Sequence, residues 1–126
     1  MDTAQRKVLE FHLSMGSPIR AYPSLNPGQD KLRLELLREE TRELSDALRA
    51  GDIVKIADAL GDLKYVIEGT ALAYGIDLKP VFNEVHRSNM TKEPKIGMGK
   101  ARKGRDYKPP KLKPILDAQA SIHSCL

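Results

Sequence analysis

Two stretches decide the fold: Leu36-Leu37-Arg38-Glu39-Glu40-Thr41-Arg42-Glu43-Leu44 and Ile56-Ala57-Asp58-Ala59-Leu60-Gly61-Asp62-Leu63. Leucine and isoleucine recur in both at helical spacing, which predicts two amphipathic helices. Glu39 and Glu43 are four residues apart, as are Asp58 and Asp62. Each pair therefore lies on one face of its helix, at the border of the apolar stripe.

The connection between the two predicted helices is very short. Gly51 is well placed to end the first helix, and Asp52 can cap the start of the second. A break of one or two residues forces the helices to turn back on each other as an antiparallel hairpin. The hairpin would bring the two acidic faces together.

Carboxylates packed this closely repel one another, and burying them is costly without a cation. Hard oxygen ligands select Mg²⁺ or Mn²⁺. The sequence therefore predicts a divalent-metal site between the two helices, and its candidate ligands are Glu39, Glu40, Glu43, Asp58 and Asp62. The alternative is that both acidic clusters are ordinary solvated helix faces.

The rest of the chain predicts an all-α protein. Aromatic residues make up 5% of the sequence and Trp is absent, which favours helices over a β-sandwich. We expect helices over residues 3–15, about 30–50, about 53–74, a fourth beginning after Asp77, and a short one over about 114–122. Residues 17–28 hold three prolines and should form a loop. Two glycines, Gly61 and Gly69, fall inside the third helix, and Gly61, beside Asp62, would allow close helix contact.

Charge divides the chain into an acidic body and a basic tail. Residues 92–113 hold nine Lys or Arg against Glu93 and Asp106, a net charge of +7, which leaves about −3 for the rest. The length of 126 residues suits one domain, with a helical core over 1–92 and an irregular tail over 93–126. An acidic body with a basic tail suits a metal-bound polyanion. Asn89 and Lys92, three residues apart, could reach the same ligand.

Several classes of protein are disfavoured by composition. The single cysteine, Cys125, provides neither a disulfide framework nor a thiolate metal site. No apolar run approaches membrane-spanning length, and the N-terminus lacks the hydrophobic region of a signal peptide. We therefore expect a cytoplasmic protein with no membrane partner.

The chain resembles the MazG-like, all-α nucleoside triphosphate pyrophosphohydrolases, including their phosphoribosyl-ATP pyrophosphohydrolase-like members. Glu39-Glu40-Thr41-Arg42-Glu43 is similar to the family's E-E-x-x-E metal motif, and Ala59-Leu60-Gly61-Asp62 falls where E-x-x-D is usual. Residues 85–92 resemble an asparagine–lysine segment of the small phage and bacterial members. The Gly- and Lys-rich stretch into Tyr107 and Pro109-Pro110 resembles their tail, so the likeness covers about Phe11 to Pro110.

This resemblance implies a bundle of four main helices completed by dimer or tetramer formation. It also implies Mg²⁺- or Mn²⁺-dependent cleavage of a nucleoside triphosphate to monophosphate and pyrophosphate. Glu39 or Glu40 would activate water, while the five carboxylates hold metal. The implied substrate ligands are Asn89, Lys92, Lys100, Lys103 and Arg105. Likeness to small phage enzymes favours a purine such as dGTP, with dUTP or dCTP as the alternative, and a phage origin would place the protein in the host cytoplasm.

One departure from the family pattern stands at Ala59, where glutamate is usual. Asp58, one residue earlier, is on the same side of the helix as Asp62, so the number of metals and the role of Asp58 stay open. Two other classes compete with an enzyme: a helical adaptor whose acidic faces are solvated, and a nucleic-acid-binding module using residues 92–113. The tail has few aromatics, which disfavours nucleic acid as partner.

Overall fold

The computed structural model describes residues 1–94 and 99–124, with side chains through Ser121. Within these residues the chain forms five helices and no strand, so the predicted all-α class is confirmed. The chain divides into two compact units, residues 1–76 and 77–126, each described separately below. Residues 95–98 of the predicted tail loop and Cys125 lie outside the described residues.

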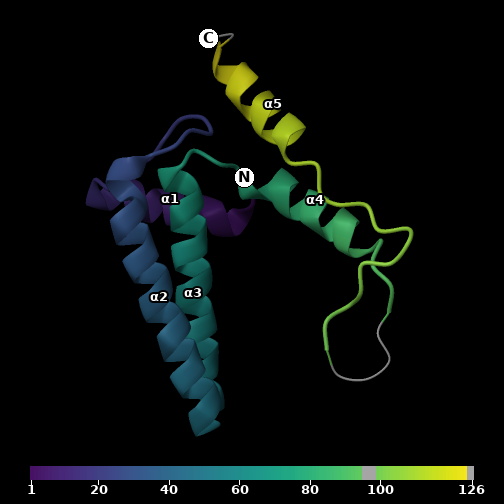
Figure 1. The fold of residues 1–126 in the computed structure, drawn as a ribbon. Helices are drawn as coiled ribbons and strands as arrows, with labels where there is room; N and C mark the ends of the chain where they lie inside the picture. The colour runs from purple at the N-terminus through teal and green to yellow at the C-terminus, as the bar shows by residue number, and fades with distance from the viewer. Residues whose placement is uncertain (95–98, 125–126) are drawn as a thin grey trace. The chain divides into compact units, whose positions relative to one another are not determined.

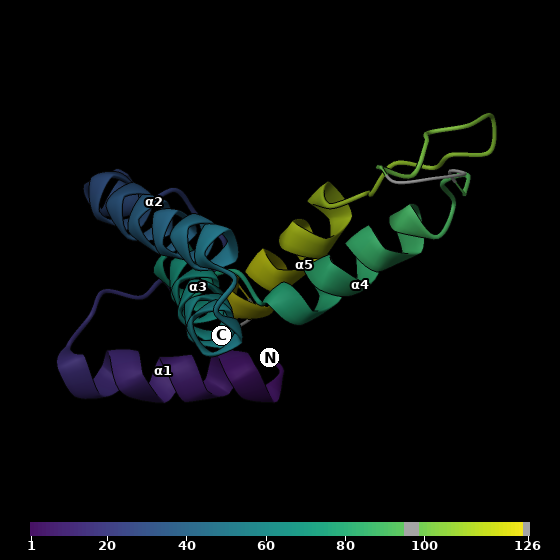
Figure 2. The same ribbon diagram turned by 90° about the horizontal axis from the view of Figure 1, so that it is seen from below.

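The first unit contains α1 (Thr3–Met15), α2 (Pro27–Ala50) and α3 (Ile53–Ala73). Helices α2 and α3 run side by side as a hairpin (Figure 1), and α1 crosses α3 (Figure 2). Gly51 ends α2 with a φ of 66°, a left-handed conformation that suits glycine. The Asp52 carboxylate accepts hydrogen bonds from the amides of Val54 and Lys55, at 3.1 and 3.2 Å. The predicted hairpin and both of its caps are therefore confirmed.

Helix α2 begins at Pro27, three residues before the predicted start. Proline is favoured in the first turn of a helix, where its missing N–H would have had no partner. The prediction that Pro27 and Gly28 belong to the loop is therefore wrong. The loop before them, residues 17–26, is fastened to the end of α3, because the Asn26 side chain donates to the Ala73 carbonyl at 2.9 Å.

The core of the first unit is made mostly of small residues. Val8, Ala47, Ala59, Ala71, Leu72 and Ala73 are its buried apolar side chains. Larger apolar side chains of these helices are exposed in the single chain, among them Leu13, Leu32, Leu48, Leu60 and Ile67. An exposed apolar set of this size on paired helices is typical of a surface that another protein surface covers.

The second unit contains α4 (Leu78–Asn89) and α5 (Lys113–Ser124). Asp77 caps α4 by accepting from the Lys79 amide at 3.1 Å. The Gln119 side chain bonds both backbone groups of Asp77, each at 3.0 Å, and so ties α5 to the start of α4. Between the helices an isolated antiparallel bridge pairs Glu93 with Arg102.

No helix within the described part of the chain combines the length and the apolar character needed to cross a membrane.

Candidate metal centre

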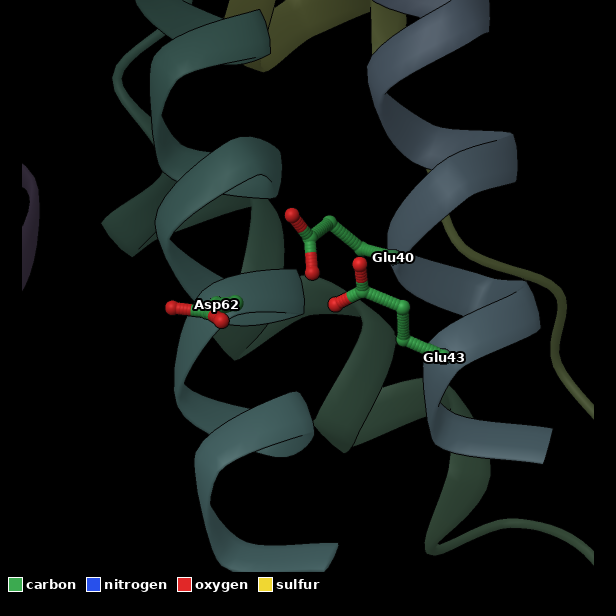
Figure 3. Close-up of side chains that lie close together, drawn as sticks. All are labelled: Glu40, Glu43 and Asp62. Atoms are coloured by element: carbon green, nitrogen blue, oxygen red, sulfur yellow. The ribbon is translucent and has the colours of Figure 1, made fainter. Parts of the chain in front are cut away.

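Three of the five predicted carboxylates meet across the α2–α3 hairpin. Glu40 and Glu43, almost one turn apart on α2, extend toward α3, where Asp62 lies (Figure 3). One carboxylate oxygen from each residue lies within 4.8 Å of the other two. The hairpin therefore places three oxygen donors close enough together to share one ion.

Glu40 is the unusual member of this trio. Its side chain is half-buried, and its Oε2 atom is buried with no hydrogen-bond partner. Burial, followed by the charges of Glu43 and Asp62, raises the pKa of Glu40 above its ordinary value of 4.5. The ionised form of Glu40 is therefore disfavoured both by the loss of hydration and by repulsion from the neighbouring carboxylates.

A bound divalent cation would offset both the desolvation of the Glu40 carboxylate and its repulsion from the neighbouring carboxylates. Exposed acidic groups occur commonly without an ion, but a buried carboxylate oxygen without a partner is costly unless something binds it. The donors of the trio are all carboxylate oxygens, the ligands that Mg²⁺ and Mn²⁺ prefer. The residues therefore fit the metal that the sequence predicts.

The other two predicted ligands lie beside the trio but are not part of it. Glu39 is exposed on α2, and its charge contributes to the raised pKa of Glu40. Asp58 is exposed on α3, one turn before Asp62, and lines a pocket of about 450 Å³ together with Glu43. A role for Glu39 or Asp58 as a ligand stays a prediction.

Ala59, at the position of the usual glutamate, is 4% exposed and packs in the interface between α2 and α3. It lines the same pocket as Glu43 and Asp58. Ala59 thus lies beside the same pocket as one member of the trio, Glu43.

All five predicted substrate ligands belong to the second unit. Asn89 is the last residue of α4, and its carbonyl accepts from the Lys92 amide at 3.1 Å. Lys100, Lys103 and Arg105 are exposed. The Lys103 ammonium lies 5.2 Å from the centre of the Tyr107 ring, within cation–π range. Contact of these residues with a substrate stays a prediction.

A buried polar cluster, which no sequence motif predicts, lies in the first unit. Arg33 on α2 is buried, and its guanidinium donates to Thr70 Oγ1 at 3.1 Å and to the Val66 carbonyl at 3.0 Å. His12 of α1 is also buried, and burial followed by the Arg33 charge lowers its pKa.

Gly69 was the available signal for this cluster. A Cβ atom at Gly69 would lie 2.8 Å from both Arg33 Nη2 and His12 Nε2, so the glycine makes room for the two side chains. At Gly61, by contrast, a Cβ atom would meet nothing within 4 Å. The predicted close helix contact at Gly61 is therefore wrong for the single chain, and the close approach occurs at Gly69.

Two comparisons with known proteins find relatives of this chain. An uncharacterized protein of Acanthamoeba polyphaga mimivirus is 37% identical over 81 residues, which are 60% of this chain and 32% of that protein. The chain thus spans about a third of that relative's length. Residues 8–89, which include the hairpin and all five carboxylates, match the family described as phosphoribosyl-ATP pyrophosphohydrolase. The chain belongs to the phosphoribosyl-ATP pyrophosphohydrolase family.

Proposed function

We propose that this protein is a nucleotide pyrophosphohydrolase that converts a nucleoside or deoxynucleoside triphosphate to its monophosphate and pyrophosphate. The observation that carries the proposal is the Glu40–Glu43–Asp62 trio, whose buried Glu40 oxygen has no partner, in a chain of this family. In the reaction, water attacks the α-phosphorus and the bond from that phosphorus to the bridging oxygen breaks. The products are a nucleoside monophosphate and pyrophosphate.

The carboxylates have two roles in this proposal: binding the metal ion and accepting a proton from the attacking water. Glu40, Glu43 and Asp62 hold Mg²⁺ or Mn²⁺, and Asp58 is a further candidate ligand. A bound divalent ion neutralises the triphosphate, polarises the attacked phosphorus and makes water more acidic. Glu39 or Glu40 accepts the proton of the attacking water. Because Glu39 lies outside the trio, it is the better candidate for this role.

Phosphate recognition falls to the basic residues of the second unit in this proposal. Lys92, Lys100, Lys103 and Arg105 supply positive charge for phosphate oxygens, and Asn89 contributes an amide. Likeness to small phage enzymes favours a purine deoxynucleotide such as dGTP over dUTP or dCTP.

We also propose that the active form is a homodimer or homotetramer in the cytoplasm. Apolar side chains that are exposed along the α2–α3 hairpin support this assembly: Leu32, Leu34, Leu48, Ile53, Val54, Leu60 and Ile67. Burying such residues against a second copy would be favourable at roughly 25 cal/mol for each Å² removed from water.

A panel assay tests the proposed reaction. Purified protein with Mg²⁺ or Mn²⁺ is incubated with each NTP and dNTP, and monophosphate and pyrophosphate are resolved separately. We expect one preferred nucleotide, release of pyrophosphate, and loss of activity in Glu43→Gln. Glu35→Gln, an exposed substitution on the same helix, is the matched control. Absence of turnover with every nucleotide and both metals would contradict the proposal and favour the helical adaptor.

A further inference from the structure

The chain that follows α4 returns along that helix in the opposite direction. We call residues 102–111 the return segment. It begins at the Glu93–Arg102 bridge, where the Glu93 amide donates to the Arg102 carbonyl at 2.8 Å and the Glu93 carbonyl accepts from the Arg102 amide at 3.2 Å. From there the return segment contacts α4 and its C-terminal turn through a series of side-chain bonds.

Two hydroxyls hold the middle of the return segment. Ser88, on the last turn of α4, is 1% exposed, and its Oγ atom donates to the Lys108 carbonyl at 2.8 Å. The Thr91 hydroxyl accepts from the Lys108 amide at 2.9 Å and donates to the Ser88 carbonyl at 2.7 Å. Both backbone groups of Lys108 are therefore bonded to side chains of α4 and its C-terminal turn.

An ion pair on α4 holds the following residues. Arg87 and Glu84 pair at 2.7 Å, and the hydrogen bond from Arg87 is the main reason that the pKa of Glu84 is lowered. The same Arg87 donates to the Pro109 carbonyl at 3.1 Å, and Glu84 accepts from the Lys111 amide at 3.1 Å. Positions 84, 87, 88 and 91 follow helical spacing, so one face of α4 and its C-terminal turn holds the return segment.

These bonds fix the backbone and leave the cationic side chains exposed. Lys103, Arg105, Lys108 and Lys111 are all exposed, and only Asp106 opposes them between positions 103 and 111. A flexible basic segment loses conformational freedom when it binds a polyanion, whereas a segment that is already ordered loses less. The bonds to Lys108 therefore order cations before a ligand arrives.

We propose that Ser88 and Thr91 are positioning residues, which hold the return segment on α4 so that its cations bind the polyphosphate of the substrate. This inference rests on the proposed function for the identity of the ligand. Neither residue touches phosphate in the proposal: both act through the backbone of Lys108.

The test compares the full-length wild type with Thr91→Val and Ser88→Ala. Thr91→Ser keeps the hydroxyl and is the rescue control, and Ser14→Ala removes an exposed hydroxyl of α1. Three quantities are measured: amide exchange of residues 102–111, affinity for inorganic tripolyphosphate by calorimetry, and kcat and KM with Mn²⁺ on the preferred nucleotide. A thermal unfolding curve for each variant shows that it folds.

We expect faster amide exchange at Lys108 in Thr91→Val and Ser88→Ala. Affinity for tripolyphosphate should fall by up to about tenfold, because a hydrogen bond that keeps the return segment ordered favours the ordered form by at most about that factor. KM should rise by a similar factor with kcat within about twofold, because a contact made equally to substrate and transition state changes KM alone. Thr91→Ser and Ser14→Ala should resemble the wild type.

Unchanged exchange and unchanged tripolyphosphate affinity in both folded variants would overturn the inference, as would a fall in kcat at constant KM. Failure of the proposed function has a different signature. In that case the wild type would hydrolyse no nucleotide, while tripolyphosphate binding would still depend on Thr91 and Ser88.

Discussion

Glu40 and Glu43 extend together from α2 toward Asp62 of α3, and Glu40 keeps a buried oxygen without a partner beside the charges of Glu43 and Asp62. The metal-free protein therefore holds a carboxylate that would be more stable in water. Native structures keep such conflicts chiefly at functional sites, where a ligand resolves them.

Replacing Glu40 with glutamine should stabilise the metal-free protein at pH 7. The folded pKa of Glu40 is raised, so its contribution to stability is present below the unfolded pKa of about 4.5 and is lost as pH rises through the folded pKa. Glu40→Gln removes this loss, and we therefore expect the free energy of unfolding in EDTA to rise. Urea denaturation with and without Mn²⁺ measures the effect.

Bound Mn²⁺ should make the wild type more stable than Glu40→Gln, the reverse of the order expected in EDTA. Mn²⁺ should raise the denaturation midpoint of the wild type and leave that of Glu40→Gln almost unchanged, because only a bound ligand stabilises the folded state. Glu35→Gln makes the same charge change on an exposed part of α2 and should respond to Mn²⁺ as the wild type does. A wild type that Mn²⁺ does not stabilise would count against the metal site.

Alanine at the two interior glycines of α3 should have opposite effects. At Gly61 the added Cβ meets nothing within 4 Å, so the better helix propensity of alanine should stabilise the protein by up to about 1 kcal/mol. At Gly69 the Cβ would lie 2.8 Å from nitrogens of Arg33 and His12. Moving Arg33 would break its bonds to Thr70 and Val66, so Gly69→Ala should destabilise by about 2 kcal/mol or more. Thermal denaturation of Gly61→Ala and Gly69→Ala measures both effects. Shifts of the denaturation midpoint with the same sign in the two variants would refute the interpretation.

Local signals account for the parts of the fold that the sequence predicts well. Gly51 and Asp52 act through their own backbone and neighbouring amides, and the acidic faces follow from helical spacing once the hairpin is known. The grouping of Glu40, Glu43 and Asp62 without Glu39 and Asp58 depends on how the two helices are rotated against each other. Spacing within one helix does not determine that rotation.

The sequence is less informative where distant residues meet. Burial of Arg33 and His12 requires α1, α2 and α3 to meet near Gly69. No local sequence pattern predicts that these two side chains are buried. The bonds of Ser88 and Thr91 to Lys108 join residues 17 or more positions apart across an irregular segment. Both arrangements depend on tertiary contacts. In the sequence alone, each is represented only by isolated polar residues or a glycine.

The buried His12 should make folding sensitive to mild acid. Its folded pKa is lowered, so the unfolded state takes up a proton near pH 6.5 while the folded state resists it. The free energy of unfolding should therefore fall as pH drops below about 6.5, by up to about 1.4 kcal/mol per pH unit. His12→Gln should remove this part of the slope.

Urea denaturation between pH 7.5 and 5.5 measures that slope. The matched control is His86→Gln, because His86 is an exposed histidine of α4. Comparison of slopes, rather than of absolute stabilities, separates titration of His12 from any packing that its replacement disturbs. Identical slopes in wild type and His12→Gln would show that His12 does not resist protonation.

Asp62 and Asp58 should differ in their effect on metal binding. Asp62 belongs to the trio of oxygens within 4.8 Å, whereas Asp58 is exposed one turn earlier. Asp62→Asn should therefore weaken Mn²⁺ binding by at least about tenfold, since loss even of a residue that supports a ligand has effects of that order. Asp58→Asn, which makes the same change of charge on the same helix, should weaken it by less than about threefold. Calorimetric titration with Mn²⁺ in the absence of nucleotide gives both values. Equal losses would mean that Asp58 reaches the ion as well, and so takes the part that glutamate usually plays where this chain has Ala59.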